Sequence, residues 1–417
     1  MLTAKGAWTL AGGAAVALLG LALDQGVFAV AGCAAILLVV VTGLALRKVE
    51  TEVQREASAA VATEGMDIVV TLRLVPKDPK ARAFVEVRDA LPPTVELAHG
   101  SNYAIMMLHG TDPVELTYRF SCPVKGRVRI GPLRVRVQDV FGFHAVDSDE
   151  AGQTLVTVYP RQYDLRDALI RSRFPLVVSG DYVVGQPGYG SSFFALREYQ
   201  SGDPYRSINW KASARSKTFI VNQTERESHA RATVLFDMRA QATVGTPRSN
   251  AIVHGARAAA SMAHFMFRRR DKMRIVFYGD GLREVDARGD RALSTLQEAL
   301  AEAEPGGHMR LMEVVQKVLP LLRRRSPVVV VSSLYDDPTA ADAVRAMRAY
   351  EMVVVVVAPS SVKLLEAAGF APDSPEIKVA KAERELLILE MKSFGAWVVD
   401  WDPDEPFSIV MAREALL

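Results

Sequence analysis

The sequence predicts a multi-domain membrane protein with a transmembrane helical hairpin, an antiparallel β-sandwich and a doubly wound α/β domain. Three observations lead to this prediction. Two apolar runs lie near the N-terminus, short alternating strands follow to about residue 160, and strands then alternate with helical stretches. With 417 residues the chain is long enough for two or three folded units. The expected ranges are 1–48 for the hairpin, 49–160 for the β-sandwich, 161–229 for a linker segment and 230–417 for the α/β domain.

Composition narrows the class of function. The net charge is +2 with 24% charged residues, which argues against both a nucleic-acid binder and a disordered chain. A hydrophobic fraction of 49% favours membrane segments. Two cysteines, Cys33 and Cys122, are too few for a disulfide framework or a four-cysteine zinc site.

The two apolar runs are predicted to form a membrane hairpin. Ala7–Leu23 and Gly26–Leu46 each approach the roughly 20 residues that a helix needs to cross a bilayer. A cleaved signal peptide is the alternative, but the second run continues past the small residues at 29–31 that could be cut. Glycines suited to close helix contact recur along both runs, at positions 12, 13, 20, 32 and 43.

Flanking charges predict the orientation of the hairpin. Lys5 precedes the first run and Arg47-Lys48 follow the second, whereas the turn at Asp24-Gln25 carries no basic residue. Basic residues favour the cytoplasmic side, so both ends and the soluble domains are expected in the cytoplasm of a two-pass plasma-membrane protein.

The strand pattern is sharpest in "GRVRIGPLRVRVQDVFGFH". If Gly131-Pro132 formed a two-residue hairpin, Arg129 would lie opposite Arg134 and Arg127 opposite Arg136. Directly opposed like charges destabilise a sheet, so an anion would be needed to offset them. A solvated face with splayed side chains is the plainer interpretation, and contact of these arginines with anionic lipid head groups is the functional one.

The first part of the linker segment shows no long regular hydrophobic period that would predict a helix or a strand. Gly185, Pro187, Gly188 and Gly190 predict a loop. A glycine-rich nucleotide site is not indicated, because no strand-to-helix context and no Gly-Lys-Ser/Thr accompany it.

The segment "SSFFALREYQSGDPYRSINWKASARS" at 191–216 is dense in charged and aromatic residues. Ser201–Pro204 predicts a turn, Ser207 is expected to cap a short helix to about Ala214, and Thr218–Asn222 is expected to be a strand.

Charges of opposite sign surround this turn, and Trp210 offers a face for cation–π stacking. A structural clamp is therefore the favoured interpretation. The alternative is a hydrolase or transferase that uses Glu198, Asp203 and Lys211, although no nucleophile–base pair accompanies them. The residues expected in the clamp are Arg197, Glu198, Tyr199, Gly202, Asp203, Arg206, Asn209, Trp210, Lys211 and Arg215.

The stretch "FFALREYQSGDPYRSINWKASARS" resembles the signature of the domain of unknown function 58 family. The upstream "YRF…VKGRVRIGPLRVRVQDVFGF" is similar to the family's strand pair, which typically ends in Asp-Pro-Phe-Gly, whereas Val140 replaces the proline here. The resemblance implies a membrane hairpin and a β-rich domain before the signature, and a von Willebrand factor A-like, Rossmann-type domain after it. It also implies association with a MoxR-type AAA+ ATPase in the assembly or maturation of envelope or membrane complexes.

In open α/β sheets ligands bind at the carboxyl ends of the strands, and the resemblance implies a divalent ion there. Its expected ligands are Asp-x-Ser-x-Ser, a threonine and a second aspartate. Only Asp237 remains in this sequence, and the replacements at the other positions are Arg239, Gln241, His308 and Ser333. Because Arg239 would supply the positive charge of an ion, no metal and no other cofactor is predicted. A displaced site at Asp336 or Asp337 is the alternative.

These observations together predict a non-enzymatic, membrane-anchored interaction or scaffold protein with a protein partner and no nucleic acid. The face around Arg239 and His308 is where we expect a carboxylate-bearing ligand to dock. A metal-dependent adhesion-type receptor is the alternative of another class, and the missing ligands weaken it.

Overall fold

The computed structural model describes residues 1–46, 51–77, 79, 82–150, 152–165, 187–225, 231–287, 289, 291–322 and 324–414. The chain divides into two compact units, 1–159 and 160–417, which we call the β unit and the α/β unit. The predictions that concern Arg47, Lys48 and Gly185 lie outside the described residues.

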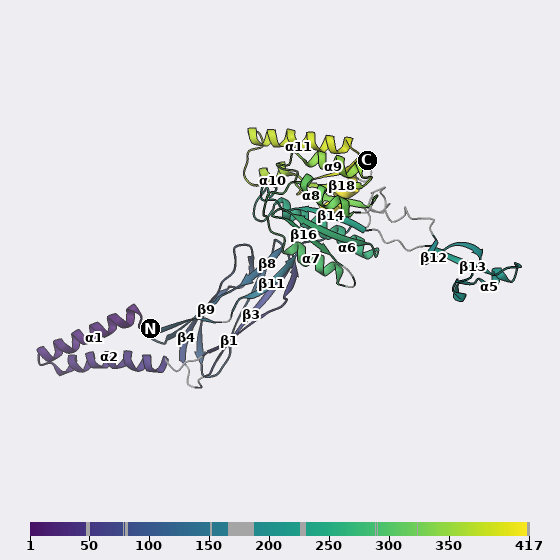
Figure 1. The fold of residues 1–417 in the computed structure, drawn as a ribbon. Helices are drawn as coiled ribbons and strands as arrows, with labels where there is room; N and C mark the ends of the chain where they lie inside the picture. The colour runs from purple at the N-terminus through teal and green to yellow at the C-terminus, as the bar shows by residue number, and fades with distance from the viewer. Residues whose placement is uncertain are drawn as a thin grey trace. The chain divides into compact units, whose positions relative to one another are not determined.

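Two helices open the β unit and lie side by side as a hairpin (Figure 1). Helix α1 spans Ala4–Ala22 and α2 spans Gly26–Leu46. Both are long and apolar enough to cross a membrane, by length and composition. Helix α1 starts three residues earlier than expected because the Thr3 hydroxyl accepts a hydrogen bond from the Gly6 N–H at 3.1 Å and caps the first turn.

Glycines allow the two helices to approach closely. A Cβ atom at Gly20 or Gly32 would collide with atoms of the opposite helix, and one at Gly13 would be crowded by it. Small residues at such contacts let backbones pack without side chains between them, which confirms the expectation for these three. The expectation was wrong for the other two, since Gly12 faces open space and Gly43 faces the His144 ring.

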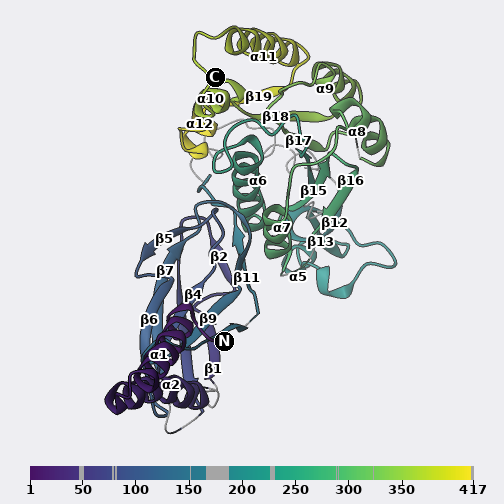
Figure 2. The ribbon, with the colours of Figure 1, turned by 90° about the vertical axis from the view of Figure 1, so that its left-hand side faces the viewer.

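The rest of the β unit is made of two main sheets with a third small one, and its strands are seen side by side in Figure 2. The sheet orders are β1-β3-β7-β5, β10-β9-β4-β6 and β2-β11-β8. All pairings are antiparallel except that of β2 with β11. One apolar core is shared by residues from all three sheets, as alternating strands require. The strands are β1 (Thr51–Ala57), β2 (Val61–Thr63), β3 (Asp67–Pro76), β4 (Arg82–Asp89), β5 (Glu96–His99), β6 (Tyr103–His109), β7 (Val114–Ser121), β8 (Gly126–Ile130), β9 (Leu133–Asp139), β10 (Ala145–Glu150) and β11 (Thr154–Tyr159).

The prediction of a hairpin at Gly131-Pro132 was wrong. Strand β8 pairs with β11, whereas β9 pairs with β10 and β4, so the chain passes from one sheet to another at Gly131, whose φ is 103°. This arrangement turns the apolar residues of both strands into the shared core. A hairpin of β8 and β9 would have placed the arginines of one strand opposite those of the other, and such like charges destabilise a sheet.

The four arginines therefore do not oppose one another. Arg127 lies opposite Thr157 and Arg129 opposite Leu155. Arg134 and Arg136 lie opposite Asp149 and Asp147, and the Arg136 Nε is 3.5 Å from an Asp147 oxygen. The opposition that suggested an anionic lipid is absent between these strands, and lipid contact stays a prediction.

The loop after β9 contacts the start of α1. The Asp139 carboxylate accepts hydrogen bonds from the N–H groups of Phe141, at 2.8 Å, and His144. The Thr3 N–H donates to the Phe143 carbonyl at 2.8 Å, and the Lys5 ammonium to the Phe141 carbonyl at 2.9 Å. The segment in which Val140 replaces the usual proline thus joins the sandwich to the helical hairpin.

The α/β unit contains a six-stranded sheet in the order β16-β15-β14-β17-β18-β19. All neighbours are parallel except the edge strand β16, which is antiparallel to β15 and was not predicted from the sequence. Helices α6, α7 and α12 pack on one face and α8, α9 and α11 on the other. The strands are β14 (Arg231–Asp237), β15 (Lys272–Tyr278), β16 (Leu282–Asp286), β17 (Pro327–Val331), β18 (Val353–Pro359) and β19 (Trp397–Trp401). The helices are α6 (Ala251–Arg268), α7 (Ala292–Ala301), α8 (Leu311–Val318), α9 (Ala340–Ala349), α10 (Ser361–Ala367), α11 (Pro375–Ser393) and α12 (Phe407–Glu414).

Candidate functional site

The centre of the α/β sheet offers the first candidate site. Strands β14 and β17 are neighbours there, and the chain continues from β14 to β15 on one side and from β17 to β18 on the other. Carboxyl ends of parallel strands at such a change of direction form the usual ligand crevice. Asp237 is the last residue of β14, and Ser332 directly follows β17.

The Arg239 side chain fills the space between these strand ends. Its Nε and Nη2 donate to the two oxygens of Asp237 at 3.1 and 2.9 Å, a bidentate pair. The side chains of Arg239 and Asp237 are 2% and 1% exposed. The Ser332 hydroxyl donates to the same carboxylate at 2.6 Å. The Asp237 oxygens are therefore saturated by donors of the chain itself.

The loop after β17 closes over the guanidinium. The carbonyl oxygens of Asp336 and Tyr335 accept from Arg239 at 3.0 and 3.3 Å. Leu334 and Asp336 adopt φ values of 60° and 51°, a left-handed conformation that costs free energy for residues other than glycine. The contacts with Arg239 hold the loop in this conformation.

Asp337 contributes a second buried carboxylate. One oxygen lies 3.6 Å from Arg239 Nη2 and accepts from the Leu311 N–H at 3.1 Å. The other accepts from the Thr339 hydroxyl at 2.6 Å and from its N–H. Burial opposes the charge of Arg239, but the hydrogen bonds and negative charge of Asp237, with Asp337 adding to them, raise the pKa of Arg239 above its ordinary value.

The other predicted positions lie around this pair. Gln241 and His308 hydrogen-bond to each other. Ser333 donates to the Ala242 carbonyl at 2.9 Å and does not contact Asp237. No group of three metal-ligating side chains is present in the described part of the chain. Ser332 takes the place that was predicted for its neighbour Ser333, because a one-residue step at a strand end reverses the side-chain direction.

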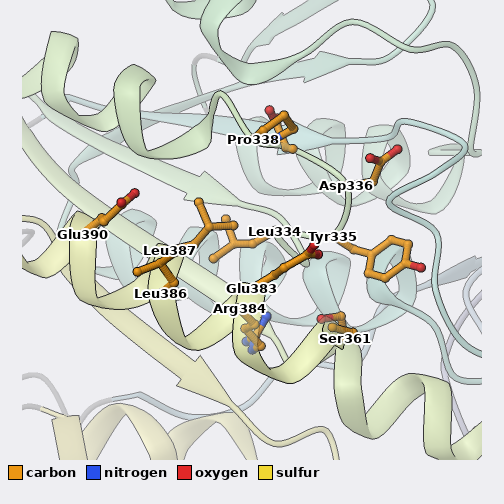
Figure 3. Close-up of a pocket in the computed structure, with 12 residues that line it drawn as sticks. Leu334, Tyr335, Asp336, Pro338, Ser361, Glu383, Arg384, Leu386, Leu387 and Glu390 are labelled. Atoms are coloured by element: carbon orange, nitrogen blue, oxygen red, sulfur yellow. The ribbon is translucent and has the colours of Figure 1, made fainter. Parts of the chain in front are cut away.

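A cavity of about 410 Å³ lies beside this pair, between the loop after β17, the start of α10 and helix α11 (Figure 3). Its rim carries the carboxylates of Asp336, Glu383 and Glu390. Arg384 is buried and donates to the Ser333 and Ala358 carbonyls, both at 2.8 Å, and to Asp400 at 2.6 Å. The lining residues are Leu334, Tyr335, Asp336, Asp337, Pro338, Ser361, Ala380, Glu383, Arg384, Leu386, Leu387 and Glu390.

The signature segment forms a separate two-stranded sheet, which we call the signature arm (residues 187–225). Strand β12 spans Pro187–Glu198 and pairs antiparallel with β13, Ile220–Glu225. The prediction of a loop at Pro187, Gly188 and Gly190 was therefore wrong, because cross-strand pairing overrides the local preference of these residues.

The helix of the arm begins later than expected. Ile208 bridges Val221 of β13 and is held extended, so helix α5 covers only Trp210–Ser213. Asn209 is its N-cap and accepts from the Ala212 N–H at 3.0 Å. The Ser207 hydroxyl instead donates to the Pro204 carbonyl at 2.6 Å. The assignment of Ser207 as N-cap was wrong.

The structure brings together only part of the expected clamp. Arg197 donates to both oxygens of Asp203 at 2.7 and 2.8 Å, across a turn in which Gly202 has a φ of 109°. Glu198 accepts from the Thr218 hydroxyl at 3.2 Å. Arg206, Lys211 and Arg215 are exposed, and no described residue forms an ion pair with any of them. These cations are available to another molecule.

Aromatic rings lie exposed beside these cations. Tyr199 stacks on Tyr205 with centroids 6.2 Å apart, and Trp210 packs edge-on against Phe219 at 6.1 Å. Trp210 is 64% exposed and Tyr205 76%. No cation of the described arm lies over the Trp210 ring, so the expected cation–π contact is not formed. Exposed aromatic residues beside basic ones are typical of protein interaction surfaces.

The chain combines two helices long and apolar enough to cross a membrane with a β-rich region and an α/β region, which is consistent with a membrane protein. The model of the family described as protein of unknown function DUF58 matches residues 195–387, from the signature arm to helix α11, and supports the DUF58 family for this chain. No curated protein matches the sequence.

Solved structures resemble parts of the chain only distantly. The cupredoxin domain of amoB from Nitrosocaldus yellowstonii is 12% identical over 27% of this chain and 87% of its own, with a TM-score of 0.20. A non-cellulosomal cohesin from Archaeoglobus fulgidus is 13% identical over 26% and 91%, with a TM-score of 0.19. Proximal thread matrix protein 1 from the mussel byssus is 13% identical over 39% and 46%, with a TM-score of 0.22.

Proposed function

We propose that this protein is a membrane-anchored, non-enzymatic interaction or scaffold protein whose soluble units lie in the cytoplasm. The observation that carries the proposal is the Arg239–Asp237 pair at the strand ends of the α/β sheet. A guanidinium held by two carbonyls and a bidentate carboxylate is a permanent part of the fold. It leaves Asp237 no free oxygen for an exchangeable ion or a proton-transfer step.

We further propose that the α/β unit is von Willebrand factor A-like. The strand order and the position of Asp237 at the end of the first parallel strand support this, together with the match to DUF58. In this interpretation the strand-end face has kept its role in binding a partner and has replaced a bound cation by Arg239.

The resemblance to DUF58 suggests a MoxR-type AAA+ ATPase as the partner, with a role in the assembly or maturation of membrane or envelope complexes. An ATPase requires ATP, so such a partner would act on the cytoplasmic side. The positive charge of Lys5 and the acidic turn at Asp24 favour the same side for the soluble units. The exposed rings and cations of the signature arm are a suitable contact surface for it.

Metal titration tests the proposal against a metal-dependent adhesion receptor. The detergent-solubilised protein is expected to keep its melting temperature as Mg²⁺ or Mn²⁺ rises from EDTA to millimolar concentrations. Binding of an ion to the native state would raise the melting temperature. A clear stabilisation at micromolar ion would overturn the metal-free interpretation of the site.

Paired variants test the proposal against an enzyme that uses Glu198, Asp203 and Lys211. In the structure Asp203 is bound to Arg197 and Glu198 to Thr218, which favours a structural role. Glu198→Gln and Asp203→Asn are then expected to reduce stability and partner binding together. Loss of cellular function with unchanged melting and unchanged binding would favour the enzyme.

A further inference from the structure

Helix α11 carries two apolar faces. Its inner face packs into the core of the sheet through Ile388 and Met391, and Ile377 is also buried on this face. A second set of apolar side chains points away from this core and is exposed. Its members are Val379, Ala382, Leu386 and Leu389.

The outer set has the spacing of a helix–helix seam. Its members are three, four and three residues apart, the alternation that places apolar side chains on one stripe facing a partner helix. Val379, Leu386 and Leu389 are 56%, 59% and 65% exposed. A lone exposed leucine is ordinary, whereas a regular stripe over three turns marks an interaction surface. We call these four residues the outer seam.

Charges beside the outer seam indicate what kind of helix it would accept. One flank carries Glu376, Glu383 and Glu390, each seven residues from the next. Glu383 and Glu390 also line the cavity, together with Asp336 (Figure 3). No ion pair to Glu383 or Glu390 is formed by any residue that the structure describes. This flank is therefore an uncompensated acidic row beside a cavity of about 410 Å³.

The opposite flank differs, since Lys378, Glu385 and Lys392 alternate in sign. This asymmetry disfavours a second copy of α11 as the partner. Antiparallel pairing would bring the two acidic rows together, whereas parallel pairing would set Glu385 against Glu390 and Lys378 against Glu383, so it gains no net charge complementarity. Like charges across a helix pair select against the antiparallel pairing.

We propose that the outer seam and the adjacent cavity bind an amphipathic helix of a partner protein. That helix has an apolar stripe for Leu386 and Leu389 and carries lysine or arginine on the flank that lies over Glu383 and Glu390. This inference rests on the proposed function and specifies the chemistry of a partner. Arg239 donates hydrogen bonds to the carbonyls of Tyr335 and Asp336, two residues that line the cavity. The buried pair therefore holds this wall of the cavity in place before a partner binds.

The test uses two designed peptides on the full-length protein in detergent with EDTA. Both peptides are three-heptad helices with leucine at the seam positions and neutral residues on one flank. On the other flank, which is to lie over Glu383 and Glu390, one peptide carries lysine and the other glutamate. Fluorescence anisotropy is expected to show binding of the lysine peptide that weakens as salt rises. Leu386→Asn should weaken it by about tenfold or more, because the seam loses an apolar contact.

Charge reversal supplies the matched control. Glu383→Lys with Glu390→Lys should weaken the lysine peptide by about tenfold and create binding of the glutamate peptide. Glu385→Lys, the same change on the other flank of the helix, should change affinity by less than about threefold. Equal binding of both peptides, or equal effects of the two flanks, would overturn the proposed charge recognition.

Other outcomes separate this inference from the proposed function. If neither peptide binds, the outer seam and the cavity do not bind a basic helix, and the inference is wrong. The proposed function is tested separately, by the metal titration and by the binding of an ATPase to the signature arm. If the protein sediments as a dimer that Leu386→Asn dissociates, the outer seam pairs with a second copy and the inference is wrong.

Discussion

Two arginine–aspartate pairs in the α/β unit have nearly the same geometry and very different surroundings. Arg239 and Asp237 form a bidentate pair with side chains 2% and 1% exposed. Arg197 and Asp203 also form a bidentate pair, but their side chains are 34% and 16% exposed. The first joins two strand ends and a loop of the sheet, whereas the second closes one turn of the signature arm.

The difference lies in desolvation. A buried charge without its partner retains the full cost of leaving water, so breaking a buried pair is expensive even when forming it brought little net stability. An exposed charge regains water when its partner is removed. The α/β sheet therefore depends on its pair, and the signature arm uses its pair mainly to shape a turn.

Removing Arg239 should have the largest effect. Arg239→Ala leaves Asp237 and Asp337 buried without a counter-charge, and we expect a loss of about 3–5 kcal/mol in the free energy of unfolding. Urea unfolding at neutral pH measures it. Because the variant leaves two carboxylates without a counter-charge, and carboxylate oxygens are hard ligands, Mg²⁺ should stabilise this variant and not the wild type.

Arg239→Lys is the control, because it keeps a positive charge at this place while it loses the bidentate geometry. It should be less destabilised than Arg239→Ala and should not respond to Mg²⁺. A stable Arg239→Ala variant would show that the pair is not needed to hold the strand ends together.

A buried imidazole without a carboxylate partner extends the comparison, because burial keeps it neutral. Burial, together with the positive charge of Arg257, lowers the pKa of His254 to about 3. The unfolded chain, with the ordinary pKa of 6.5, takes up this proton first as pH falls, so stability is lost between about pH 6.5 and 3. We expect His254 to contribute about 2–3 kcal/mol of this loss by pH 4.5.

Urea unfolding of wild type and His254→Gln across this range isolates the contribution of the imidazole. The glutamine can still bond the Ser249 hydroxyl, which lies 2.8 Å from the His254 Nε2. The variant should lose less stability on acidification than the wild type. Parallel pH profiles for the two proteins would contradict the assignment.

Breaking the exposed pair should cost little. Arg197→Ala is expected to lower stability by less than about 1 kcal/mol, and high salt should reduce the difference. The hydrogen bond from Arg197 holds the pKa of Asp203 below its ordinary value of 3.8. The contribution of the pair is thus complete above pH 3.8 and is lost only as the pH falls further. Thermal unfolding at two salt concentrations measures the first effect. A loss as large as that of Arg239→Ala would mean that the arm is buried against another part of the molecule.

Trp210→Ala should have the smallest effect on folding and a large one on binding. The ring is mostly exposed and contacts Phe219, so stability should change by roughly 0.5 kcal/mol or less. Co-purification with a MoxR-type ATPase should fall at least tenfold if the ring anchors the interface. Tyr350→Ala, an exposed aromatic at the end of α9, is the control and should leave binding unchanged. Unchanged binding of Trp210→Ala would exclude this part of the arm as the contact surface.

Local patterns in the sequence determined the elements of this protein. The apolar runs specified α1 and α2, and valine-rich runs specified β17 and β18, because apolar side chains must leave water wherever the chain goes. The pairing of Arg239 with Asp237 could also be anticipated, since two residues this close in the chain can meet without a long-range contact.

The tertiary structure decided which of these elements meet. It sent β8 and β9 into different sheets, brought Ser332 and Asp337 to the Arg239–Asp237 pair and left the outer seam of α11 exposed. Each of these results depends on residues far apart in the chain, and on which of several apolar faces finds a neighbour. The sequence alone determined which side chains had to be buried. The packing of the sheets determined which neighbours cover them.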